Sequence, residues 1–115
     1  MGDEKAFAYY LGKILDDLKF VNLRMKGISY SDFAKNDLLN CSVCFKFVQV
    51  SENTMKIPEE ALVAYPDIPW KQINGLRNRL VHDYGNIKLD VIYDAATNDV
   101  PVLIRALEKL ERGQS

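Results

Sequence analysis

Apolar residues recur at intervals of three and four along almost the whole chain, which is the spacing of one face of an α-helix. The pattern is clearest near the start, where it predicts a helix over Asp3–Met25 with Gly27 as its stop. The stripe of that helix comprises Phe7, Tyr10, Leu11, Ile14, Leu15, Leu18 and Val21. Strand signals are weak, and no Asn-Gly or Asp-Gly dipeptide marks a hairpin. We therefore expect an all-α protein.

Capping residues and prolines divide the middle of the chain. Ser29 followed by Asp32 resembles a capping box, so a second long helix is expected from there to about Thr54, with Asn36-Asp37 as its point of interruption. Its apolar stripe comprises Phe33, Leu38, Leu39, Val43, Phe47 and Val50. A proline at the first helical position predicts a short helix over Pro58–Tyr65.

Two further helices are expected after Pro69. The first has Trp70, Ile73, Leu76 and Leu80 as its stripe, and Gly85 and Asn86 end it. The second runs from Leu89 to Leu110, and Pro101 inside it predicts a kink or a restart capped by Asn98 or Asp99. The chain should form a compact bundle of four to five helices, in a single domain over residues 1–115.

Composition narrows the class of protein. Apolar residues make up 48% of the chain and charged residues 27%, which excludes a disordered polypeptide. A formal net charge of −1 argues against a polybasic nucleic-acid binder. We expect no membrane span and no secretory signal, and with only two cysteines we expect a cytoplasmic protein.

Neither the cysteines nor the aromatic residues predict a site. Cys41 and Cys44 lack the further ligands of a structural zinc centre and the preceding strand of a thioredoxin-like site, so both are expected to be small buried hydrophobic residues. The aromatic rings are expected in the core, with Trp70 as a packing anchor. We expect no metal and no cofactor.

One polar segment, residues 76–85, gathers groups suited to phosphodiester chemistry. His82, the only histidine, can give or take a proton near neutral pH, and Arg77 is a permanent cation suited to phosphate oxygens. On a continuous α-helix Asn78 and His82 share one face, and Arg77 lies about 140° from His82. His82 would move protons at the 2′-hydroxyl or the leaving oxygen of RNA, Arg77 would neutralise developing charge, and Asn78 would orient His82 or bind phosphate.

A simpler interpretation is that this segment is a helix C-terminus, where basic residues complement the dipole and Gly85 forms the cap. Composition alone favours that interpretation, because basic residues near helix ends are common. Arg79 and Asp83, four residues apart, would form a surface ion pair of little energetic value.

The motif Arg77-x4-His82-x-Tyr84 resembles the signature of HepT-like toxins in the HEPN superfamily. Flanking segments follow in that family's order across nearly the whole chain: Gly27–Phe33, Ile57–Glu60, Tyr65–Trp70, Leu76–His82, Leu89–Tyr93 and Asn98–Pro101. The resemblance implies a helical bundle that dimerises and a metal-independent endoribonuclease that arrests growth when unopposed. It implies that Arg77 and His82 are catalytic, with Asn78 the polar residue between them.

The resemblance also implies a partner, an antitoxin with a minimal nucleotidyltransferase fold of the MntA type. Such a partner transfers AMP to the tyrosine of the signature, here Tyr84. A bulky anion two residues from His82 and close to Arg77 would block the cleft and occupy the cation that substrate phosphate needs.

A single histidine bears on the oligomeric state. RNA cleavage uses both an acid and a base, so a two-fold axis beside the motif would bring two copies of His82 into one cleft. We therefore expect a homodimer, across which the local positive charge of Lys71, Arg77 and Arg79 is doubled. A hypothesis from another class is a non-catalytic module, in which the Arg77, Asn78 and His82 patch binds a nucleotide or a protein and cuts nothing.

The chain departs from the family pattern at Ser51-Glu52, where many relatives carry Gly-Glu. Serine is the better helix former, so we expect local packing and dimer geometry to differ. The Arg–His site itself is expected to be untouched by this change.

Overall fold

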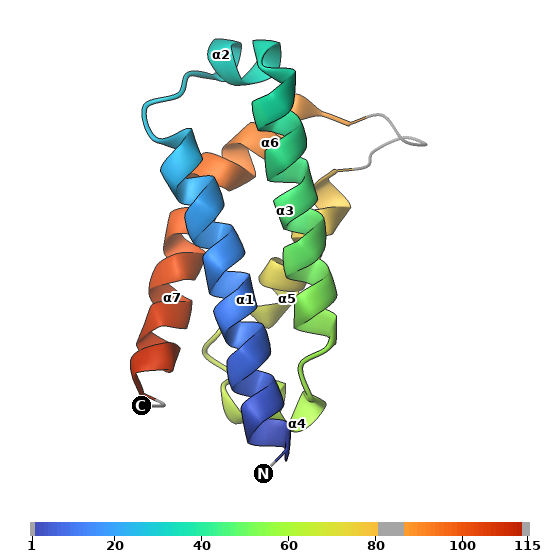
Figure 1. Cartoon of the computed structure of the whole chain (residues 1–115), viewed down its shortest axis with the longest axis vertical. Helices are drawn as coiled ribbons and strands as arrows, with labels where there is room; N and C mark the ends of the chain where they lie inside the picture. Colours follow the sequence, from blue (N-terminus) through green and yellow to red (C-terminus); the bar gives the residue numbers. More distant parts are fainter. Residues whose placement is uncertain (1, 81–86, 114–115) are drawn as a thin grey trace.

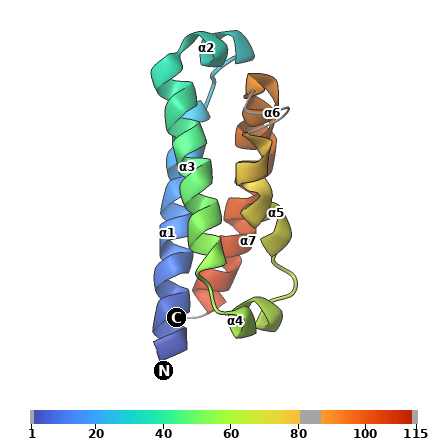
Figure 2. The ribbon, with the colours of Figure 1, turned by 90° about the vertical axis from the view of Figure 1, so that its right-hand side faces the viewer.

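Two layers of helices face one another in the computed structural model, which describes residues 2–80 and 87–113 (Figures 1 and 2). One layer holds α1 (Gly2–Met25) and α3 (Asp37–Met55) side by side. In the other layer α7 (Val100–Gly113) packs against α1, and α5 (Trp70–Asn74) packs against α3. All regular elements of the described residues are helical, which confirms the all-α, HEPN-like bundle.

The predicted first helix is observed with its stripe facing inward. All six aliphatic and phenylalanine positions of that stripe are buried, and Tyr10 is partly buried beside them. Polar contacts add to this packing, because Lys46 Nζ on α3 lies 3.0 Å from Asp17 Oδ1 on α1. α1 therefore forms a wall against which α3 and α7 pack.

The predicted second helix is divided at Asn36. Ser29 Oγ accepts from the backbone N–H of Asp32 at 3.1 Å and begins α2 (Tyr30–Lys35). Asn36 has an extended backbone, and its Oδ1 accepts from the N–H of Leu39 at 3.0 Å, so this residue ends α2 and caps α3. The Asn side chain thus supplies the partner that lets the chain turn and restart.

Prolines begin the next two helices as expected, with α4 covering Glu59–Ala64 and α5 following Pro69. The helix after Pro69 differs from the prediction, because it changes to a 3₁₀ helix, η1 (Gly75–Arg79). Its predicted end at Gly85 and Asn86 lies outside the described residues.

The helix is disturbed next to Pro101, but it does not stop and restart there as predicted. α6 (Leu89–Asp94) runs into a π-helical turn, η2 (Ala95–Asp99), and then into α7. The N–H of Val100 donates to the carbonyl of Ala95, five residues back, so the helix widens where proline cannot supply its own N–H. The prediction that Asn98 or Asp99 caps a new helix is wrong, since both lie inside η2.

Burial follows the predicted stripes with clear exceptions. Phe33 and Phe47 are fully buried, and Trp70 packs edge-on against Phe7 while its Nε1 donates to the carbonyl of Tyr65 at 3.0 Å. The expectation of aromatic rings in the core is wrong for Tyr9, Tyr30 and Phe45, which are exposed, and Leu38 of the predicted second stripe is exposed as well. No helix among the described residues is long and apolar enough to cross a membrane.

Candidate functional site

η1 presents two of the predicted site residues to solvent. Leu76 and Leu80 are buried and hold η1 against the core, while Arg77 and Asn78 between them are exposed. Because a 3₁₀ helix turns by about 120° per residue, the α-helical angle of 140° predicted for Arg77 does not apply to this segment. His82, Asp83 and Tyr84 lie outside the described residues.

Arg77 and Asn78 border a pocket of about 450 Å³. Its other described lining residues are Val48 from α3 and Leu80. The volume lies in the range of pockets that hold small ligands. The Arg77 side chain forms no ion pair or hydrogen bond with another described residue, so its charge is available at the pocket.

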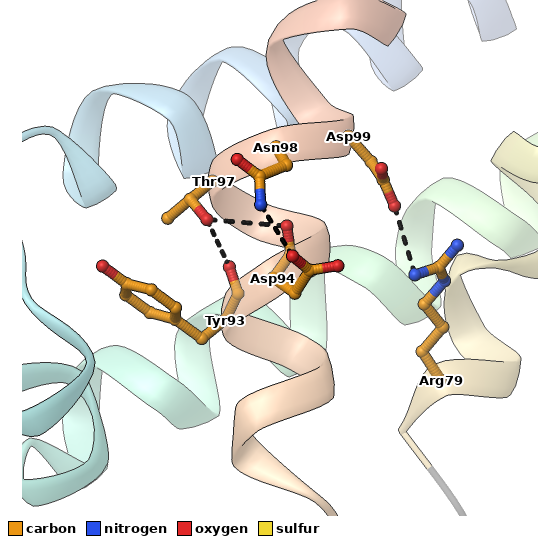
Figure 3. Close-up of polar contacts among 6 residues, drawn as sticks. All are labelled: Arg79, Tyr93, Asp94, Thr97, Asn98 and Asp99. Atoms are coloured by element: carbon orange, nitrogen blue, oxygen red, sulfur yellow. Dashed lines mark hydrogen bonds and ion pairs between the residues drawn. The ribbon is translucent and has the colours of Figure 1, made fainter.

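Arg79, unlike Arg77, forms an ion pair with a described residue. Its Nη1 lies 3.1 Å from Asp99 Oδ2, and Figure 3 shows this pair joining η1 to η2. The Asp99 oxygen is buried, and the contact is ionic rather than an aligned hydrogen bond. The positive charge that Arg79 was expected to add beside Arg77 is therefore offset by Asp99. The predicted partner, Asp83, lies outside the described residues.

The π-helical turn is what brings Asp99 to this position. Thr97 Oγ1 donates to the carbonyl of Tyr93 at 2.8 Å, and Asn98 Nδ2 donates to Asp94 Oδ1 at 2.6 Å (Figure 3). These side chains satisfy groups within the widened turn and leave Asp99 directed toward Arg79. The ion pair thus ties η1, which precedes residues 81–86, to η2, which continues α6 after them.

Ser51 contacts the site directly. This buried serine of α3 donates from Oγ to the carbonyl of Asn74 at 2.7 Å and accepts from the backbone N–H of Arg77 at 3.1 Å. The expectation that the change at Ser51-Glu52 leaves the site untouched is therefore wrong. Position 51 continues the inward stripe of Phe47 and Val50, and a hydroxyl on such a stripe signals a buried partner.

The two cysteines are not equivalent. Cys41 is exposed, so its predicted burial is wrong, whereas Cys44 is partly buried against the core. Burial, and to a smaller extent the neighbouring Cys41, raises the pKa of the Cys44 thiol above its ordinary value. The thiol of Cys44 is therefore a poor nucleophile at neutral pH.

The all-helical bundle is the fold that the resemblance to HepT-like proteins implies. The chain belongs to the ribonuclease HepT-like family, whose model matches residues 14–110. It is 30% identical over 106 residues to the Putative RNase MJ1380 of Methanocaldococcus jannaschii, covering 92% of this chain and 94% of that protein.

Other relatives match at a similar level. The Putative RNase TTE0752 of Caldanaerobacter subterraneus is 29% identical over 101 residues, covering 88% of this chain and 90% of that protein. The Probable ribonuclease HepT of Thermococcus cleftensis is 24% identical over 103 residues, covering 90% and 94%. No solved structure gives a significant match.

Proposed function

We propose that this chain is the toxin of a HEPN and minimal-nucleotidyltransferase toxin–antitoxin pair, and that it cleaves RNA without a metal ion in the cytoplasm. We also propose that residues 1–115 form a single helical domain. The observation that carries it is the exposed guanidinium of Arg77, unpaired among the described residues, beside a pocket in a chain of the ribonuclease HepT-like family.

The proposed reaction is an internal transesterification. His82 removes the proton of the 2′-hydroxyl, whose oxygen attacks the adjacent phosphorus while the bond to the 5′ oxygen breaks. The leaving oxygen takes a proton from a second acid, which gives a 2′,3′-cyclic phosphate and a 5′-hydroxyl. Arg77 stabilises the negative charge that develops on the phosphoryl oxygens, and Asn78 orients His82 or binds phosphate.

The second acid is best supplied by another copy of the chain, so we propose that the active form is a homodimer. The outer face of α3 supports this proposal, because it exposes Leu38, Phe45 and Met55, with exposed fractions of 84%, 58% and 59%. Val48, on the same helix, lines the pocket beside Arg77. A second copy seated against these exposed apolar side chains would cover them and bring two pockets close together.

The chemical groups at the ends of the RNA fragments test the proposed reaction. The purified chain, incubated with RNA in the presence of a metal chelator, should release fragments with 5′-hydroxyl and 2′,3′-cyclic phosphate ends. An RNA with 2′-O-methyl groups should stay intact, because the attacking oxygen is blocked. The appearance of no new ends in unmodified RNA would instead support a non-catalytic binding module.

The proposed partner transfers AMP from ATP to the hydroxyl oxygen of Tyr84, with cleavage of the bond between the α- and β-phosphates and release of pyrophosphate, and thereby silences the toxin. Tyr84→Phe keeps the ring and removes the hydroxyl that would accept the AMP. We expect growth arrest by this variant to persist when the nucleotidyltransferase is co-expressed, whereas the wild type is neutralised. Tyr93→Phe is the matched control, because its hydroxyl donates to the carbonyl of Ile28 and is already engaged. Equal neutralisation of Tyr84→Phe and wild type would rule out modification at Tyr84.

A further inference from the structure

Ser51 stands apart from the other hydroxyl residues of α3. Ser42 and Thr54 each donate to a carbonyl four residues back in their own helix. Ser51 instead reaches out of α3, and its hydroxyl lies between the carbonyl of Asn74 and the N–H of Arg77. Asn74 is the last residue of α5 and Arg77 lies in η1, so the hydroxyl bridges the change from α-helix to 3₁₀ helix.

The two groups that Ser51 joins are the pair that a 3₁₀ turn ordinarily joins directly, since it bonds each N–H to the carbonyl three residues earlier. The serine hydroxyl bonds to both groups and so links the first turn of η1 to α3. The path of the backbone at Arg77 is therefore set partly by a residue 26 positions earlier in the chain.

We propose that Ser51 is a positioning residue for Arg77, which holds the start of η1 so that the guanidinium lies at the pocket lined by Val48, Asn78 and Leu80. This inference rests on the proposed catalytic role of Arg77. The buried leucines of η1 supply attraction to the core, but apolar contacts have no direction. The two hydrogen bonds of Ser51 are directional and fix the height of Arg77 along α3.

Loss of the hydroxyl leaves two backbone groups to find other partners. The Asn74 carbonyl and the Arg77 N–H then lose their tie to α3, so the backbone that carries Arg77 is freer to shift and to open. A displacement of about 1 Å at a catalytic group can lower a rate about 100-fold. The effect should fall on the chemical step, since Arg77 is proposed to act on charge that develops in the transition state.

Ser51→Ala tests the inference, with Thr54→Val as the matched control. Both variants delete one buried hydroxyl from α3, but the hydroxyl of Thr54 bonds only within its own helix. We expect Ser51→Ala to lower kcat for RNA cleavage by about 10- to 100-fold with KM changed less than about twofold. Thr54→Val should leave kcat within about twofold of wild type, even if both variants lose similar thermal stability.

A second measurement does not depend on ribonuclease activity. The amide proton of Arg77 is held by Ser51 Oγ, so its hydrogen exchange, followed by NMR, should be faster in Ser51→Ala and unchanged in Thr54→Val. Unchanged exchange at Arg77 in folded Ser51→Ala would overturn the inference. So would wild-type kcat in Ser51→Ala while Arg77→Ala is inactive. Full activity in Arg77→Ala would instead overturn the proposed role of Arg77, whatever the exchange data show at that amide.

Discussion

Arg77→Ala should abolish RNA cleavage and growth arrest while the protein stays folded. The side chain is exposed and bonds to no other described residue, so its removal should change the free energy of unfolding by less than about 0.5 kcal/mol. Loss of a group that stabilises developing charge lowers rates by about 100- to 1000-fold. Initial cleavage rates and thermal unfolding, measured on the same preparation, separate these two effects.

Arg105→Ala provides the control for Arg77→Ala. It removes the same side chain and the same charge from an exposed position on α7, away from η1. Cleavage by this variant should stay within about twofold of wild type. His82→Ala should resemble Arg77→Ala, because loss of a general acid or base costs about 100- to 10,000-fold in rate. Wild-type activity in purified Arg77→Ala or His82→Ala would contradict the proposed mechanism.

Among the proposed substitutions, Phe47→Ala should lower the free energy of unfolding the most. The ring is fully buried between α3 and the rest of the core, and truncation of a buried phenylalanine costs about 3–5 kcal/mol. This is a large share of the stability of a small domain, about 5–15 kcal/mol. Chemical denaturation followed by circular dichroism measures the change.

Phe45→Ala is the matched control, two residues away on the same helix and 58% exposed. Its stability at low protein concentration should fall by less than about 1 kcal/mol, because little buried surface is lost. If α3 forms the dimer face, Phe45→Ala should also weaken self-association in sedimentation experiments. Equal destabilisation by the two substitutions at every concentration would contradict the described packing of α3.

The fold was predictable where one physical cause acts alone. The stripe of α1 is a repeat of apolar residues without a competing signal, and its burial follows directly. The break at Asn36 was visible because asparagine bonds readily to nearby backbone groups. Pro101 indicated a disturbance, but its form depends on how the chain reassigns hydrogen bonds, which gave a π-helical turn in place of a capped restart.

The candidate site was less predictable, because its construction depends on contacts between distant segments. In the sequence the expected partner of Arg79 was Asp83, four residues away, and only the approach of η2 brings Asp99 to it. Cys41 was expected to be buried from the general behaviour of cysteine, yet it lies on the uncovered side of α3. Ser51 was noticed as a departure, but its bond to Arg77 spans 26 residues and needs the packed structure.

α1 begins and α7 ends at the same end of the bundle (Figure 1). A flexible linker from the end of α7 in one copy to the start of α1 in a second copy would join the two within one polypeptide. In such a single-chain pair, a substitution can be placed in one half only, which is impossible when identical chains assemble freely. RNA cleavage by such half-substituted proteins would show how many histidines and arginines one catalytic unit requires.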